Sequence, residues 1–216
     1  AFLCADKGET ALPAEQIELI DALKGRGVKI IAVLDAENVT DLSFADKCCA
    51  VLFSARGGQK LANAVFEIIT GLVNPSGKLS RPIAEDEKIR YPLGYGLSYT
   101  KFAYSKLSVT ERGVALTVSN VGEYDGYAVV TMRIGKKNKK EGSEEPTRLR
   151  GFKKVFVKKN DTAKIEIPFG EETFRTYDSE KKKYRNEGGE YTVRIYDGSP
   201  NGVLDGELTL APYVYD

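Results

Sequence analysis

The sequence contains no histidine, which limits the residues that could perform chemistry. Ser–His–Asp and Cys–His systems are therefore excluded, and any catalysis must use carboxylates, tyrosines or lysines. Glu9 stands out among the carboxylates, since it lies between an apolar run at 1–5 and a predicted helix that starts at Pro13. If that run is a strand of a parallel sheet, Glu9 lies at the carboxyl edge, where α/β folds bind ligands. Position alone favours a structural role, in which Glu9 stabilises the positive end of the following helix.

Asp35 suggests a different chemistry. It directly follows the apolar run VKIIAVL at 28–34, and an aspartate at the end of a buried strand has the geometry of a phospho-accepting receiver. Such a site also needs paired acidic residues near the first strand to hold Mg²⁺, and only Asp6 is present there. We therefore rank the receiver interpretation last.

The cysteines do not indicate a metal or cofactor site. Cys4, Cys48 and Cys49 include no C-x-x-C pair, and without histidine a zinc site is not expected. Neighbouring residues of a strand point to opposite faces, so we expect one of Cys48 and Cys49 to be buried. Cysteines used as small core residues, with no signal peptide, suggest a cytoplasmic location. Ala1–Leu3 resembles the middle of a strand, so we expect a longer natural protein, and secretion stays open.

The charge balance excludes two classes of partner. The sequence has 32 Lys and Arg residues against 31 Asp and Glu residues, which gives no basic field for nucleic acid. Its longest apolar runs are far too short to cross a membrane. We expect neither nucleic acid nor a membrane as a partner.

The first part of the chain has the pattern of an α/β layer. Three apolar runs predict buried strands of a parallel sheet: 1–5, 28–34 and 48–53. Helices are expected after Pro13 and over 57–72, where apolar residues recur at helical spacing. About three strands is a small sheet for this architecture. We therefore expect only part of an α/β domain, with an apolar edge that favours a partner such as a second copy of the chain.

After Tyr99 the apolar residues alternate with a period of two. Six such segments predict strands: 104–110, 113–120, 126–134, 152–158, 162–169 and 190–197. Short strands at this spacing indicate an antiparallel β-sandwich of the immunoglobulin or fibronectin type. The expected fold class is α/β plus all-β. The stretch GKKNKKEGSEEP at 135–146 mixes both charge signs and indicates a solvated loop.

Two glycine-containing stretches lie where the pattern changes. GYG at 94–96 is a weak phosphate-loop signal, since it has no strand–loop–helix context and no following G-K-[ST]. In GLVNPSGKL at 71–79, Gly71 can cap a helix and Gly77 can permit a turn. We interpret both stretches as structural.

Several longer segments resemble glycoside hydrolase family 3, the β-glucosidase family. GGQKLANAVFEIITGLVNPSGKL at 57–79 is similar to its Gly-Gln…Gly-x-x-Asn-Pro-Ser-Gly-(Arg/Lys)-Leu segment. YPLGYGLSYTKF at 91–102 is similar to its Tyr-Pro-Phe-Gly-Tyr-Gly-Leu-Ser-Tyr-Thr-x-Phe linker, with Leu93 in place of phenylalanine. EEPTRLRGFKKVFVKKNDTAKIEI at 144–167 and YRNEGGEYTVRIYDGS at 184–199 resemble its fibronectin-III-like module.

The resemblance implies retaining hydrolysis of β-linked glycosides. In the family, the nucleophile is an aspartate on an N-terminal (β/α)₈ barrel, to which no residue here corresponds. The acid/base glutamate comes from the α/β domain, from a loop before a Leu-Pro helix start that ALPAEQIELI at 11–20 resembles. The loop here is short and lacks the family's Glu-Gly-x-Asp-Arg, so Glu9 is the acid/base candidate by position only. With at most one of the two carboxylates, the chain alone is expected to be inactive.

The resemblance also implies the domain organisation. We predict a partial α/β domain at 1–90, a linker at 91–103 in which Tyr91, Tyr95 and Tyr99 pack, and a fibronectin-type domain at 104–216. The expected partners are a β-glucoside or oligosaccharide, the missing barrel domain, and a second copy of the chain.

The alternative is a non-catalytic module whose sandwich binds carbohydrate or protein. The exposed rings of such a module would be those of four tyrosines: Tyr124, Tyr127, Tyr177 and Tyr184. The competing interpretation is that these tyrosines pack in the core or at the rim of the sandwich.

Overall fold

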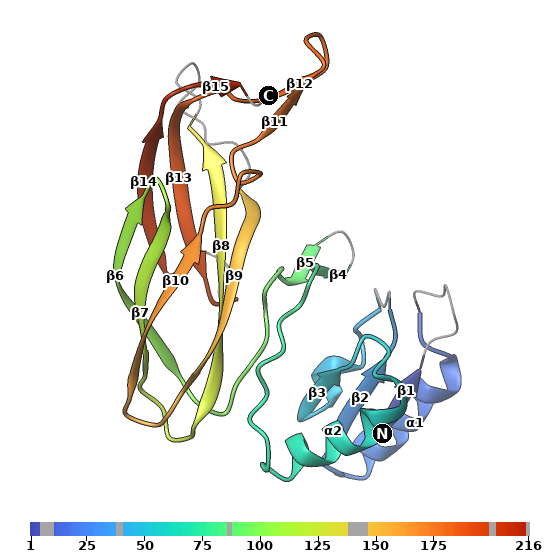
Figure 1. The fold of residues 1–216 in the computed structure, drawn as a ribbon. Coiled ribbons are helices and arrows are strands. Elements are labelled where there is room, and N and C mark those ends of the chain that lie inside the picture. Colours follow the sequence, from blue (N-terminus) through green and yellow to red (C-terminus); the bar gives the residue numbers. More distant parts are fainter. Residues whose placement is uncertain (5–10, 38–40, 86–87, 138–146, 199–201, 215–216) are drawn as a thin grey trace. The chain divides into compact units, whose positions relative to one another are not determined.

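The chain forms two compact units. The computed structural model describes residues 1–4, 11–37, 41–85, 88–137, 147–198 and 202–214, with the elements drawn in Figure 1. One unit comprises residues 1–73 and 82–91, and the other comprises residues 74–81 and 92–216. Residues 74–81 thus belong to the second unit, although the residues that follow them, 82–91, belong to the first. The predicted boundaries at 90 and 104 stay a prediction.

The first unit is a parallel α/β layer. Its elements are β1 (Phe2–Cys4), α1 (Ala14–Gly25), β2 (Ile31–Asp35), the 3₁₀ turn η1 (Ala45–Lys47), β3 (Ala50–Phe53), the 3₁₀ turn η2 (Gly58–Lys60) and α2 (Leu61–Ile69). The strands pair in the order β1-β2-β3, and both pairings are parallel. The predicted parallel arrangement is therefore confirmed for the described sheet.

The core of this unit lies around the central strand. Ala32, Val33 and Leu34 of β2 are buried, and Ile20 of α1 and Phe44 are fully enclosed. Because β3 lies at the edge of the described sheet, Ala50 is exposed and the other three side chains are only half-buried, so the prediction of a buried strand at 48–53 was wrong in this respect.

Of the three cysteines, Cys48 packs against the core of the α/β unit as a partly buried side chain. Cys4 and Cys49 are exposed and Cys48 is half-buried. On β1 the burial pattern is exposed, buried, exposed, so Leu3 faces the core and Cys4 does not. Cys48 and Cys49 precede β3, which begins at Ala50, so the alternation expected within a strand does not apply to them. Burial raises the pKa of the Cys48 thiol.

A small hairpin completes the first unit. It consists of β4 (Ile83–Glu85) and β5 (Lys88–Tyr91), which pair antiparallel. Ile83 and Tyr91 pack against the α/β core. Arg90 donates to the carbonyl oxygen of Leu42 at 3.3 Å and pairs with Asp46 at 2.5 Å, which fastens the hairpin to the layer.

The second unit is an antiparallel β-sandwich. One sheet has the order β10-β7-β6 and the other β14-β13-β8-β9. These strands are β6 (Phe102–Thr110), β7 (Gly113–Asn120), β8 (Gly126–Lys136), β9 (Arg148–Val157), β10 (Thr162–Pro168), β13 (Gly189–Tyr196) and β14 (Leu204–Leu210). The predicted all-β class is confirmed.

Strand alternation builds the core of the sandwich. Along β7, every second side chain is buried, and β8 has nearly the same pattern. Val118, Val130 and Ile195, from both sheets, are fully buried in one cluster. A third small sheet, β11-β12-β15, carries β11 (Thr176–Asp178), β12 (Lys183–Asn186) and β15 (Tyr213–Val214). No helix in the described part of the chain is long and apolar enough to cross a membrane.

Candidate functional site

The candidate site lies at the carboxyl edge of the α/β sheet. Because β1, β2 and β3 are parallel, their C-terminal residues Cys4, Asp35 and Phe53 end at the same edge. The described ends of these strands therefore lie together at the edge where open α/β sheets bind ligands. Glu9, the predicted acid/base, follows β1 in the sequence but lies outside the described residues.

Gln16 fixes the end of the first strand. Its side-chain amide accepts a hydrogen bond from the Cys4 N–H at 3.0 Å and donates one to the Cys4 carbonyl oxygen at 3.1 Å. These two bonds attach the end of β1 to α1. Gln16, which our sequence reasoning did not single out, thereby holds Cys4, the last described residue before the segment that contains Glu9.

Asp35 orders the segment after the third strand. Its carboxylate accepts hydrogen bonds from the Ser54 hydroxyl at 2.5 Å and the Gly57 N–H at 2.9 Å. These bonds, led by that of Ser54, lower the pKa of Asp35, so the group is ionised at neutral pH. The carboxylate is engaged in holding a loop, which favours a positioning role over a phospho-acceptor. Among the described residues, no three His, Cys, Asp or Glu side chains are placed to hold a metal ion.

The loop that Asp35 holds is strained. Ala55 and Arg56 have φ angles of 47° and 68°, in the left-handed region that non-glycine residues seldom adopt. Two such residues in succession cost roughly 1–2 kcal/mol each, so the surrounding bonds must enforce this shape. Arg56 pairs with Glu37, which follows β2, at 3.0 Å. The edge thus presents an ionised carboxylate, a guanidinium and a hydroxyl on a fixed loop.

The Asn-Pro-Ser-Gly stretch is a structural joint within the second unit. The Asn74 side-chain oxygen accepts hydrogen bonds from the Ser98 hydroxyl and the Tyr99 N–H, both at 2.9 Å. Its amide nitrogen donates to the carbonyl oxygen of Asp125 at 3.0 Å. One side chain therefore links three segments that are distant in sequence.

The glycines of the Gly-Tyr-Gly stretch permit close backbone contact. A Cβ on Gly96 would lie 2.1 Å from the carbonyl oxygen of Gly77, and one on Gly198 would lie 2.1 Å from that of Gly94. The backbones also pair, with the Leu79 N–H bonded to the Tyr95 carbonyl oxygen at 2.9 Å. These contacts support the structural interpretation of residues 91–100.

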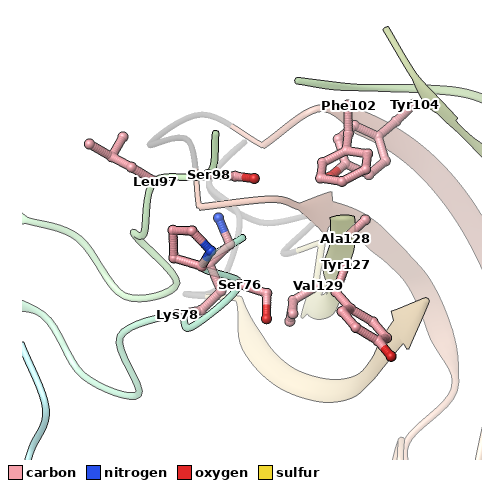
Figure 2. A pocket seen from close by; sticks show the side chains of 10 residues that line it. Ser76, Lys78, Leu97, Ser98, Phe102, Tyr104, Tyr127, Ala128 and Val129 are labelled. Carbon is pink, nitrogen blue, oxygen red and sulfur yellow. The ribbon is translucent and has the colours of Figure 1, made fainter. Parts of the chain in front are cut away.

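The cavity at this joint is too small for a sugar. Figure 2 shows Ser76 and Lys78 on one side and Tyr104 and Tyr127 of the sandwich on the other. Its volume is about 20 Å³, which is room for about one water molecule. Burial lowers the pKa of Lys78 and raises that of Tyr104, and the Lys78 ammonium donates to the Gly96 carbonyl oxygen at 2.6 Å.

The tyrosines depart partly from expectation. Tyr91 packs against the α/β core, whereas the Tyr99 side chain is 46% exposed and Tyr99 is bonded to Asn74 through its backbone N–H. The four tyrosines considered for sugar stacking are all exposed at the surface rather than in the core: Tyr124, Tyr127, Tyr177 and Tyr184.

Comparisons with known protein families agree with this architecture. Residues 4–99 match the Glycosyl hydrolase family 3 C-terminal domain, and residues 134–199 match the Fibronectin type III-like domain. Among solved structures, a β-D-glucoside glucohydrolase from Trichoderma reesei has a TM-score of 0.87 at 20% identity, over 97% of this chain and 39% of that one. A β-glucosidase of the same family from Bifidobacterium adolescentis has a TM-score of 0.85 at 26% identity, over 98% of this chain and 38% of that one.

Similar sequences point the same way. The chain is 28% identical over 242 aligned residues to thermostable β-glucosidase B of Acetivibrio thermocellus. The aligned region covers 92% of this chain and 32% of that protein. It is 29% identical over 245 residues to probable β-glucosidase K of Emericella nidulans, which covers 95% of this chain and 29% of that protein. The chain thus spans about a third of the length of these relatives. Its residues match the C-terminal domain of glycosyl hydrolase family 3 followed by a fibronectin type III-like domain, and the chain resembles the C-terminal region of the family's β-glucosidases.

Proposed function

We propose that this chain is the C-terminal portion of a retaining hydrolase of β-linked glycosides. The observation that carries the proposal is the similarity to thermostable β-glucosidase B over 92% of the chain. The substrate of the complete enzyme is a β-glucoside or oligosaccharide. The fixed loop at the carboxyl edge of the sheet supports this assignment, since open α/β sheets bind ligands at that edge.

Retaining hydrolysis requires two carboxyl groups about 5 Å apart. The nucleophile attacks the anomeric carbon while the acid/base protonates the departing glycosidic oxygen, and the same group then takes a proton from the water that releases the sugar. We assign the acid/base role to Glu9, which follows the strand end that Gln16 holds. The nucleophile belongs to a barrel domain outside this chain.

The described residues have positioning roles in this proposal. Gln16 holds the end of β1, and Asp35 holds residues 54–57 through Ser54 and Gly57. Arg56 is available on that loop to interact with sugar hydroxyl groups, with Glu37 fixing its direction. Catalysis is sensitive to such placement, because reacting groups must be within about 3–3.5 Å and aligned.

The first test is hydrolysis of p-nitrophenyl β-glucoside by this chain alone and by the full-length gene product. We expect activity only in the full-length protein, because one carboxylate cannot complete the double displacement. Activity of the isolated chain would overturn the assignment of the nucleophile to another domain.

The second test addresses Glu9 in the full-length protein. Glu9→Gln should lower turnover by about 10²–10⁴-fold, the usual contribution of a general acid/base. Azide should restore turnover of an activated aryl glycoside, since it attacks the glycosyl-enzyme without a base. Glu15→Gln, in the first turn of α1, is the matched control and should retain activity. Equal activity of the two variants would exclude Glu9 as the acid/base.

One observation favours a second function, carbohydrate binding by the sandwich. Tyr127 and Phe156 face each other across β8 and β9 with ring centroids 5.1 Å apart, and Phe152 is 69% exposed. Exposed rings can stack on sugar faces. Calorimetric titration with cello-oligosaccharides tests this, with Phe152→Ala as the variant that should lose binding. No heat change in the unaltered chain would exclude it.

A further inference from the structure

A second cavity lies at one end of the sandwich, within the second unit. Its volume is about 220 Å³, many times the roughly 10–15 Å³ that one water molecule needs. The walls come from the end of β8, the start of β9, residues 173–176 and the start of β13. The rings of Phe174 and Tyr191 pack edge to face at 4.9 Å and form an apolar part of the lining.

The lining of this cavity carries an excess of positive charge. Lys136, Arg148 and Arg150 line it, and Glu187 is the single carboxylate among its lining residues. Glu187 pairs with Lys136 at 2.8 Å and also with Arg185 at 3.1 Å, so its charge is already shared. The Lys136 bond, the largest cause, lowers the pKa of Glu187 and keeps it ionised.

The two arginines have no carboxylate partner among the described residues. Arg150 donates a hydrogen bond to the backbone carbonyl oxygen of Glu172 at 3.3 Å. The pairing of β8 with β9 shifts from Met132↔Gly151 to Arg133↔Leu149, so Arg150 is the extra residue of a β-bulge. Bulges redirect side chains, and this one lets Arg148 and Arg150 both line the cavity.

Thr173 adds a hydroxyl-bearing side chain to the lining. This residue is 3% exposed, and Thr176 also lines the cavity. Gathering cations around one cavity is unfavourable unless an anion offsets their charge. An oxyanion with further hydroxyl groups would pair with the arginines and form hydrogen bonds with the threonines.

We propose that this cavity binds a sugar acid, whose carboxylate pairs with Arg148 and Arg150 and whose ring contacts Phe174. The size of the cavity exceeds what a bare inorganic ion fills, and guanidinium groups pair with carboxylates through two parallel bonds. The cavity belongs to the second unit, whereas the carboxyl edge of the parallel sheet belongs to the first.

The proposal is tested by isothermal titration calorimetry of this chain at low ionic strength. The probes are sodium glucuronate, glucose and sodium sulfate. We expect saturable binding of glucuronate that weakens with salt, and binding of glucose and of sulfate that is at least about tenfold weaker, because each lacks part of the interaction. Absence of glucuronate binding, or equal binding of sulfate, would overturn the assignment.

Matched variants separate the cavity from general charge attraction. Arg148→Gln changes an exposed side chain that lines the cavity and should weaken glucuronate binding by about tenfold. Lys153→Gln removes one exposed charge from the same strand, outside the cavity lining, and should leave binding unchanged. Equal effects of the two substitutions would overturn the proposal, and thermal unfolding of both variants checks that the fold is retained.

Discussion

The two units of this chain differ in how completely they enclose apolar side chains. In the sandwich, buried residues of two facing sheets form one continuous cluster. In the α/β unit, the described sheet has three strands, Phe66 of α2 is 62% exposed, and Leu72, which follows this helix, is 71% exposed. Since hydrophobic stabilisation scales with the apolar area removed from water, we infer that the sandwich is the more stable unit.

The largest expected effect comes from opening each core separately. Ile195 in the sandwich and Ile20 in the α/β unit are both 0% exposed, and replacing either by alanine should cost about 2–5 kcal/mol. If the units unfold separately, the α/β unit unfolds at a lower denaturant concentration than the sandwich. Ile20→Ala then lowers the midpoint of the α/β unit alone, and Ile195→Ala lowers the midpoint of the sandwich alone. Residue-resolved hydrogen exchange in denaturant measures both. One shared transition that both variants shift equally would contradict the difference in stability.

A smaller effect is expected at the joint of the sandwich unit. Gly96→Ala should destabilise this unit by about 1–3 kcal/mol, because its Cβ would lie 2.1 Å from the Gly77 carbonyl oxygen and the two segments must separate. Gly77→Ala is the matched control, since a Cβ there meets no atom within 4 Å. Urea denaturation of both variants makes the comparison. Equal stability of the two would mean that the segments are not closely packed in solution.

The sequence predicted the sandwich more fully than the α/β unit, for a physical reason. A strand with one buried face records its environment in every second residue, as in GVALTVSN, which forms β7 from Gly113 to Asn120 as expected. The strand β14 (Leu204–Leu210) was missed, because Gly206 takes the place of an apolar residue in its alternation.

Edges and joints were predicted less well, because they depend on contacts between distant segments. An apolar run predicts a strand but does not say whether it lies at an edge, so the burial of the β3 side chains, and of one of Cys48 and Cys49, was overestimated. The bonds of Gln16 to Cys4 and of Ser54 to Asp35 join residues 12 and 19 positions apart. Their only sequence signal is a polar residue near the end of a predicted strand or the start of a helix.

The pH dependence of the α/β unit provides a third test. Bonds from Ser54 and Gly57 lower the pKa of Asp35 in the folded state. Its contribution to stability is therefore fully present above the pKa of an unfolded aspartate, about 3.9, and is lost as the pH falls through the lower folded pKa. When the pH falls from neutral to below the folded pKa of Asp35, the α/β unit of Asp35→Asn should therefore lose less stability than that of the wild type. Glu18→Gln, exposed on α1, is the control. The same pH profile in the wild type and Asp35→Asn would contradict the role of the carboxylate.

The smallest effect is expected on the uncovered face of α2. Phe66→Ala should change the stability of the α/β unit by no more than about 0.5 kcal/mol, since the ring is 62% exposed, whereas Val65→Ala, at a site 8% exposed, should cost about 1–2 kcal/mol. Chemical denaturation of both variants, with sedimentation velocity, checks this. If Phe66→Ala instead costs as much as Val65→Ala and also lowers the sedimentation coefficient, a second copy covers this face in solution. The contrast between a closed sandwich and an open α/β unit would then hold for the single chain and not for its assembled form.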